Sequence, residues 1–245
     1  MNREYFLRWR GRNWPRPAAI AAIAVTVAGV VSFGALTVQR CGATEAESLH
    51  STANYSDQWR LRNPSATVEN ILGLTCGMDL LVAVGDGGLI MTSTDGQDWI
   101  RRESGTSHKL ADVTFGNDMF VAVGGEGTVL TSSDGERWIQ RESGVDYYIQ
   151  SVATDGKSIY VGAAWDALLI SSDGVTWKAQ KLENDIKVRR VCYVNNLFIA
   201  MGRQILTSVN GFDWVLRDIG SWTDELVAAT YGNGRILAIG FQTVG

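Results

Sequence analysis

Short apolar segments recur along residues 71–240 in a fixed order of four. The first alternates apolar and polar positions, as in LADVTFG at 110–116, and the second is a compact apolar run, as in FVAVG at 120–124. A third segment such as TVLTS (128–132) precedes a polar turn, and the fourth begins at a tryptophan, as in WIQRE at 138–142. Strands of four to seven residues separated by Gly and Asp turns predict antiparallel meanders of four strands.

The meander returns about every 40 residues. Its fourth strand opens at Trp99, Trp138, Trp177 and Trp214, and a degenerate copy, TANYSDQW, ends at Trp59. The spacings between successive tryptophans are therefore 40, 39, 39 and 37 residues. A repeat of this length built from short strands is typical of a β-propeller blade. The sequence predicts an all-β fold, a β-propeller of four-stranded blades.

A Ser-x-Asp-Gly-x-x-Trp turn joins the third and fourth strands. Asp-Gly accepts the positive φ angles of a tight turn, and Asp and Ser side chains can bond nearby backbone amides. The tryptophan offers a large apolar body to the neighbouring blade. Because each acid has its own glycine-bearing turn, we predict a structural role and no calcium or catalytic role. The residues are Ser93, Asp95, Gly96 and Trp99; Ser132, Asp134, Gly135 and Trp138; Ser171, Asp173, Gly174 and Trp177; and Asn210, Gly211 and Trp214.

The turns TSSDGERW and ISSDGVTW resemble Asp-box repeats of the BNR type, which occur in sialidases and in photosystem II assembly factor-like propellers. The resemblance covers residues 52–245 and implies the propeller fold. Two copies depart from the pattern, with Tyr55 and Asn210 at the Asp position. Such propellers host many functions, so the motif implies little about activity.

The two ends of the repeat region are complementary. TANYSDQWRLRN aligns with the end of a third strand and a fourth, and residues 226–245 align with strands one, two and the start of three. Pairing them would complete one blade and remove exposed edges. We therefore expect a propeller of about five blades over residues 55–245, with the N-terminal strand closing the last blade. A truncated chain or an open assembly is the alternative.

Residues 19–38 contain no charge, and twenty such residues match the length of a transmembrane helix. Residues 1–18 hold five arginines and predict a cytoplasmic N-terminus, while residues 39–54 are small and polar and predict a linker. We expect a single-pass protein of a bacterial inner membrane with its propeller in the periplasm. A cleaved signal peptide is the alternative.

Charge and metal-binding side chains narrow the possible partners. Residues 41–245 carry a net charge of about −9, which disfavours nucleic acid as a partner. Three cysteines make no disulfide framework, and Cys76 and Cys192 are expected as small core residues. With two histidines and no Cys-x-x-Cys, neither a metal site nor a cofactor is expected.

No set of residues in the sequence predicts catalysis. The first strands offer Arg189, Arg190, Asp112 and Tyr231, but not the recurring arginines that sialidase-like chemistry would need. Neither a nucleophile-elbow motif nor a phosphate-binding loop is present in the sequence. We therefore predict no catalytic residues and a protein that is not an enzyme.

The loops between strands two and three, and those between blades, differ among the copies and should share the face opposite the Asp-box turns. Large aromatic side chains beside charges on such loops predict a binding surface; the alternative is that some of them fold back and cover the channel. We expect docking or assembly of another membrane or extracytoplasmic protein; carbohydrate binding on Trp165 and Trp222 is the alternative, followed by a glycosidase. The candidate residues are Trp165, Asp166, Tyr147, Tyr148, Trp222, Asp224, Glu126 and Arg203.

An arginine recurs three residues after the blade tryptophan. It is present at Arg62, Arg102, Arg141 and Arg217, and Gln180 takes its place in the remaining copy. On an outer strand this charge could protect the edge or pair with Glu103, Glu142 and Asp218. A basic ring that binds a partner is the alternative.

Overall fold

The computed structural model describes residues 69–183, 186–219, 225–233 and 235–240. The predicted basic N-terminus (1–18), transmembrane helix (19–38) and linker (39–54) lie outside these ranges. Within the described ranges, no helix is both long and apolar enough to cross a membrane.

Four consecutive antiparallel sheets of four strands follow the predicted repeat, and we call each of them a blade. Two further strands begin a fifth sheet. The elements are β1 (Ile71–Gly77), β2 (Leu80–Gly85), the 3₁₀ turn η1 (Asp86–Gly88), β3 (Ile90–Ser93) and β4 (Ile100–Arg102); β5 (Leu110–Gly116), β6 (Met119–Gly124), β7 (Val129–Ser132) and β8 (Ile139–Arg141); β9 (Ser151–Thr154), β10 (Tyr160–Ala164), β11 (Ala167–Ser171) and β12 (Lys178–Lys181); β13 (Val188–Val194), β14 (Leu197–Gly202), β15 (Ile205–Ser208) and β16 (Val215–Arg217); and β17 (Leu226–Gly232) with β18 (Arg235–Gly240).

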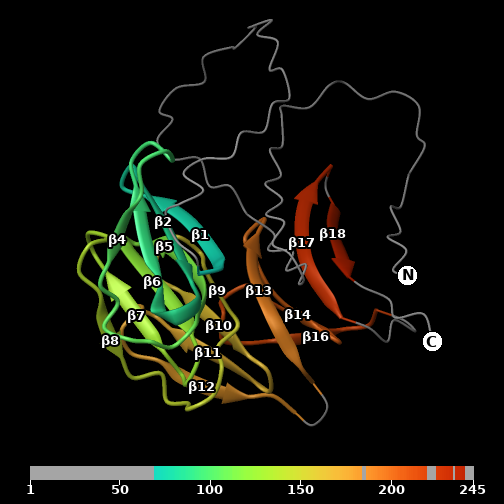
Figure 1. Cartoon of the computed structure of the whole chain (residues 1–245). Coiled ribbons are helices and arrows are strands. Elements are labelled where there is room, and N and C mark those ends of the chain that lie inside the picture. Colours follow the sequence, from blue (N-terminus) through green and yellow to red (C-terminus); the bar gives the residue numbers. More distant parts are fainter. Residues whose placement is uncertain (1–68, 184–185, 220–224, 234, 241–245) are drawn as a thin grey trace, which may run out of the picture.

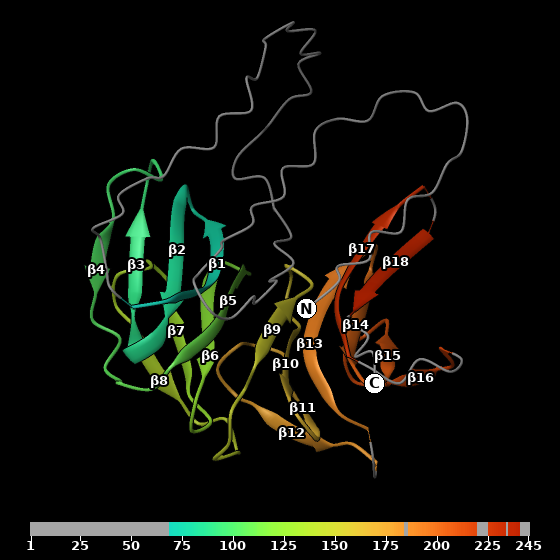
Figure 2. The ribbon, with the colours of Figure 1, turned by 45° about the vertical axis from the view of Figure 1, so that its right-hand side comes forward.

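The blades are arranged side by side around a shared interior. The first strand of each blade contacts the first strand of the next, from β1 through β5, β9 and β13 to β17, and the fourth strands lie on the outside (Figures 1 and 2). The pairing of first and second strands shifts register at its start in β1, β5, β13 and β17. Such a bulge bends the strand and redirects its side chains.

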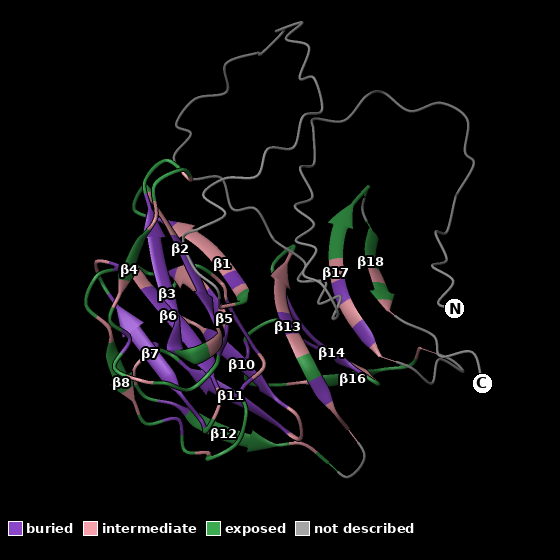
Figure 3. Cartoon of the chain, in the orientation of Figure 1, coloured by how far each residue is buried: buried purple, intermediate pink, exposed green. Residues whose placement is uncertain are grey.

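The core lies between neighbouring blades. Val82 and Val84 of β2 pack with Phe120 and Leu130 of the second blade, whereas Ala83 points to the other side of its sheet. Alternation along the strand thus gives each blade two apolar faces. The second and third strands are buried along most of their length, while the fourth strands are largely exposed (Figure 3). Burying a side chain such as Phe120 contributes about 1.5–3 kcal/mol.

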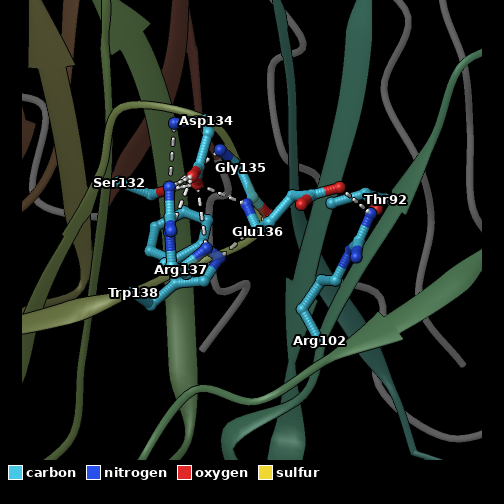
Figure 4. Close-up of polar contacts among 8 residues, drawn as sticks. All are labelled: Thr92, Arg102, Ser132, Asp134, Gly135, Glu136, Arg137 and Trp138. Atoms are coloured by element: carbon cyan, nitrogen blue, oxygen red, sulfur yellow. Dashed lines mark hydrogen bonds and ion pairs between the residues drawn. The ribbon is translucent and has the colours of Figure 1, made fainter.

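Each Asp-box turn is held by its own side chains (Figure 4). The Ser132 hydroxyl oxygen accepts the Gly135 N–H at 2.8 Å, and one Asp134 carboxylate oxygen accepts the N–H groups of Glu136 and Arg137, both at 2.9 Å. The Trp138 indole donates to the Gly135 carbonyl at 3.1 Å. The serine and Asp or Asn bonds recur in the other three turns. These bonds pair backbone N–H groups of the turn with side chains of the same turn.

The glycine of the turn also contacts the preceding blade. A Cβ on Gly135 would lie 2.4 Å from Leu80 Cδ2, and one on Gly174 would lie 2.3 Å from Met119 Cε. Both glycines have φ +72°, a conformation that L residues seldom adopt. The Asp-box turn is therefore a contact between blades as well as a hairpin.

The recurring arginine binds the neighbouring strand of its own blade. Its Nε donates to a threonine hydroxyl on the third strand, in the pairs Arg102–Thr92 (3.0 Å), Arg141–Thr131 (2.9 Å) and Arg217–Thr207 (2.7 Å). Arg102 also forms an ion pair of 2.7 Å with Glu136 in the next blade (Figure 4). The third blade has Gln180 and Ile170 at these two positions, so both members of the pair are replaced together. The threonine partner was not predicted.

The two described cysteines differ. Cys192 is a free, half-buried thiol, and burial raises its pKa to about 11. Cys76 is half-buried and disulfide-bonded, which differs from the expected core residue.

We predict that Gly135→Ala lowers the free energy of unfolding by about 2–4 kcal/mol, because the left-handed conformation and the overlap with Leu80 both carry a cost. Gly105 is the matched control, since it has φ +75° with open space around it. Gly105→Ala should cost only about 1–2 kcal/mol. Chemical denaturation measures both values. Equal losses in the two variants would show that the contact between blades adds nothing.

We predict that Asp134→Asn reduces the loss of stability in acid. The N–H groups of Arg137 and Glu136 hold the pKa of Asp134 below its usual range. The ionised form therefore stabilises the fold above the ordinary pKa of about 3.9, and this contribution is lost as the pH falls. Asn210 accepts the equivalent bonds as a neutral amide, both at 2.9 Å, so the variant should fold normally at pH 7. Melting temperatures at pH 7 and pH 3 test this; an unchanged acid-induced drop contradicts it.

Candidate functional site

We call the surface formed by the loops between second and third strands, together with the connections between blades, the loop face. The two kinds of loop pack directly on each other. The Gly127 N–H donates to the Tyr147 carbonyl at 2.9 Å, and a Cβ on Gly88 would lie 2.0 Å from the Thr106 carbonyl oxygen. The Ser143 hydroxyl, which is buried, donates to the Val145 carbonyl at 3.0 Å. The loop face is therefore held in place by the blades beneath it.

Two adjacent tyrosines on the connection between β8 and β9 are exposed. Tyr147 is 38% exposed and Tyr148 is 37% exposed. Burial raises the pKa of Tyr147, and the negative charge of the nearby Asp166 carboxylate adds to this effect. Two predicted site residues from different loops are thus brought together. Tyr147 presents exposed aromatic surface beside this carboxylate.

Tyr148 lies among charges of both signs. Burial raises its pKa, Lys109 and Arg190 oppose the rise, and Asp86 and Asp112 add to it. Lys109 forms an ion pair of 3.2 Å with Asp86. Exposed aromatic surface with charges of both signs nearby is suited to a partner with polar groups around an apolar contact.

Asp86 itself is fixed by a second donor. The Asn70 amide donates to the other Asp86 carboxylate oxygen at 2.8 Å, and this bond, more than Lys109, lowers the pKa of Asp86. Beside it, the His108 ring lies 3.2 Å from the Thr128 hydroxyl. The first two blades therefore present a hydrogen-bonded polar region next to the tyrosines.

Trp165 is half-buried, and another side chain covers one face of its ring. The Arg189 guanidinium lies 4.6 Å from the ring centroid and also forms an ion pair of 3.2 Å with Glu225. Trp165 has φ +56°, and its carbonyl accepts the Val188 N–H at 2.8 Å. A cation over an indole contributes about 0.5–2 kcal/mol. Sugar stacking on that face would have to displace Arg189.

The other predicted residues are more scattered. Glu126 is exposed at the tip of its hairpin and has φ +51°. Arg203 is also exposed, and its backbone N–H donates to the Lys187 carbonyl at 3.3 Å. Trp222 and Asp224 lie outside the described residues. The structure thus groups Tyr147, Tyr148 and Asp166, and separately Trp165.

Arg189, Lys109 and Asp86 were not among the predicted binding residues. Arg189 occupies the bulge position of its first strand, and the corresponding residues of the other described copies are Leu72, Ala111, Gln150 and Val227. A charge at a position that is uncharged in the other described copies was the signal that could have identified it.

A cavity of about 300 Å³ lies between the first strands. At one level, the cavity is lined by the residues that follow the bulge position of each first strand. These residues are Asp112, Ser151 and Arg190, from the second, third and fourth blades. One Asp112 oxygen accepts the Ser151 hydroxyl at 2.8 Å and the Val152 N–H at 3.1 Å. Its other oxygen accepts the Val113 N–H at 2.9 Å. Burial raises the pKa of Asp112, against the effect of Arg190.

This cavity wall ties blades together. The Ser151 hydroxyl oxygen also accepts the Val191 N–H at 3.3 Å, so that three successive first strands are joined through Asp112 and Ser151. Both Asp112 oxygens serve this network. In the described part of the chain, no group of three or more His, Cys, Asp or Glu side chains could hold a metal ion.

Comparison with known proteins relates the fold to solved structures. No protein-family model and no curated protein sequence matches the chain. It is similar to YCF48 from Cyanidioschyzon merolae (19% identity, TM-score 0.53, 70% of this chain and 63% of that one) and to a structure described as YCF48 bound to D1 peptide (13% identity, TM-score 0.54, 70% and 61%). It is also similar to virginiamycin B lyase from Staphylococcus aureus (11% identity, TM-score 0.61, 73% and 72%).

These matches bear on the fold alone, because all are below 20% identity. The chain spans less than two thirds of the two YCF48 structures. Together with the four consecutive meanders, they show that the described residues form an all-β structure of the β-propeller class.

Proposed function

We propose that this protein is a non-enzymatic docking module, a propeller of about five blades with Asp-box turns, anchored by residues 19–38 and exposed outside the cytoplasm. One observation carries the docking role. The exposed Tyr147 and Tyr148 lie on a loop face that is held in place by the blades, and the ion-paired Lys109 and Asp86 lie near Tyr148.

The chemistry of this surface favours a protein partner. Tyrosine supplies a large contact area with few rotatable bonds, and aromatic residues often carry most of the binding energy of an interface. The Asp86–Lys109 pair lies near Tyr148 and offers polar contacts at a rim. One similar structure is described as YCF48 bound to D1 peptide, which supports a protein partner by analogy.

Two features support anchoring and an extracytoplasmic location. Residues 19–38 have the length and composition of a membrane span, and arginines precede them. Cys76 is disulfide-bonded, and such bonds persist mainly in oxidising compartments.

The surface gives less support to carbohydrate binding or catalysis. Arg189 covers one face of the Trp165 ring, which weakens the case for a sugar platform there. Asp112 lines the cavity, and its oxygens accept three hydrogen bonds from the protein itself. A structural role, in which Asp112 joins neighbouring blades, explains this arrangement without a catalytic role.

We predict that Tyr147→Ala/Tyr148→Ala reduces recovery of a specific partner at least ten-fold, in an affinity pull-down of the full-length protein in mild detergent read by mass spectrometry. Removing two central aromatic residues should cost about 2–4 kcal/mol of binding. The matched control is Val209→Ala/Phe212→Ala, which removes exposed apolar side chains from an Asp-box turn on the opposite face.

Equal recovery with the tyrosine variant and wild type would exclude the tyrosine pair as the docking site. Loss only in the Val209/Phe212 control would transfer the site to the Asp-box face. Binding of a glycan array, with no specific protein recovered, would favour the carbohydrate alternative.

A further inference from the structure

The cavity between the first strands contains a charged side chain without a partner. The charged residues among its described lining are Asp112, Asp155 and Arg190. Arg190 is half-buried, yet within the described ranges its guanidinium group forms neither a hydrogen bond nor an ion pair. A guanidinium group has several N–H donors and no acceptor, and leaving it unpaired where water is partly excluded costs free energy. The cavity wall therefore offers donors and a positive charge that the protein itself does not use.

Both acids of the cavity, in contrast, are occupied by the protein. Asp112 accepts three hydrogen bonds, and one Asp155 oxygen accepts three backbone N–H groups of its own hairpin, each at 2.9 Å. Asp155 is four residues beyond Ser151, about 13 Å along an extended strand, so it lies at another level of the cavity. The charge of Arg190 lowers the pKa of Asp112, which places the two groups near each other. The complement that Arg190 lacks is an anion with acceptor oxygens.

The cavity beside Arg190 is apolar. The residue after the bulge is Ala228 in β17 and Gly73 in β1, where β5 and β13 have Asp112 and Arg190. Because β13 contacts β17, the small Ala228 leaves space next to the guanidinium group. The apolar lining continues with Leu72, Leu74, Val191, Met201, Val227 and Ala229. An anionic group bound to Arg190 would thus be in reach of apolar surface.

We propose that this cavity binds a small monocarboxylate with an apolar body. The planar carboxylate matches the fork of the Arg190 guanidinium and can accept two parallel N–H bonds from it. The apolar body packs beside Ala228 and Val227. A doubly charged anion is disfavoured, because it would be repelled twice as strongly by the Asp112 carboxylate. The cavity volume of about 300 Å³ lies at the lower end of the range for small-molecule sites.

This site is separate from the tyrosine pair of the loop face. Arg190 and Asp112 influence the pKa of Tyr148, so the carboxylate end of the site lies toward the loop face. Tyr147 and Tyr148 are not among the residues that line the cavity. The proposal therefore goes beyond the docking role and does not rest on it.

The test is NMR of the full-length protein in a maltoside detergent, labelled with ¹³C at the methionine methyl groups and titrated with sodium benzoate at pH 7. Met201 lines the cavity, whereas Met119 lies beside Gly174 outside the lining and serves as the internal reference. We expect the Met201 signal, assigned with Met201→Leu, to shift with a Kd of about 1 mM or tighter. The Met119 signal should not shift. Benzamide, which has the same shape without the charge, should bind at least ten-fold more weakly.

Two variants test the two parts of the site. Arg190→Gln should weaken benzoate binding at least ten-fold, because it removes the charge and the fork. Arg203→Gln is the matched control, since Arg203 is exposed and outside the lining, and it should bind as wild type does. Ala228→Leu should also weaken binding at least ten-fold by filling the apolar side while keeping Arg190. Unchanged Met91 and Met119 signals show that each variant is folded.

Three results would overturn the proposal. They are an unshifted Met201 signal, equal binding of benzoate and benzamide, and unchanged benzoate binding in folded Arg190→Gln. The titration needs no docking partner, so its outcome and that of the pull-down are independent.

Discussion

Burial between neighbouring blades is the constraint on which the rest of the structure depends. A blade here is a single sheet with two apolar faces, such as Val82 on one side and Ala83 on the other, and it has no core of its own. Each blade is therefore stable only when both faces are covered. Two features act at the contacts between blades. The Asp-box glycines touch the preceding blade, and the Asp112–Ser151 network joins three first strands.

The same constraint distinguishes the residues that stabilise the fold from those that are available for function. Residues that repeat in all four complete blades, such as the serine and tryptophan of the Asp-box turn, are occupied by hydrogen bonds within the turn or by packing on the core. Residues that differ between copies concentrate on the loop face. His108 and Lys109 of the first blade stand at the positions of Tyr147 and Tyr148, and Arg189 is the only charged residue at its position in the described blades. This division is what allows a repetitive fold to carry a specific surface.

The fold was largely predictable, because strand length and tryptophan spacing are local properties of the sequence. The fourth strands begin at Ile100, Ile139, Lys178 and Val215, each one residue after the predicted tryptophan. The site was only partly predictable. Sequence variation identified Tyr147 and Trp165, but the position of Arg189 over Trp165 depends on the β13 bulge and on the approach of two blades. Contacts of this kind between distant segments have no signature in a single sequence.

Hydrogen–deuterium exchange of the full-length protein, compared between native membranes and purified detergent micelles, tests the docking claim most directly. The account predicts slower exchange in membranes over residues 106–109 and 145–149 of the loop face, with unchanged exchange in the Asp-box turns 94–98 and 133–137. Protection confined to the Asp-box turns, or identical exchange on both faces in the two preparations, would contradict it.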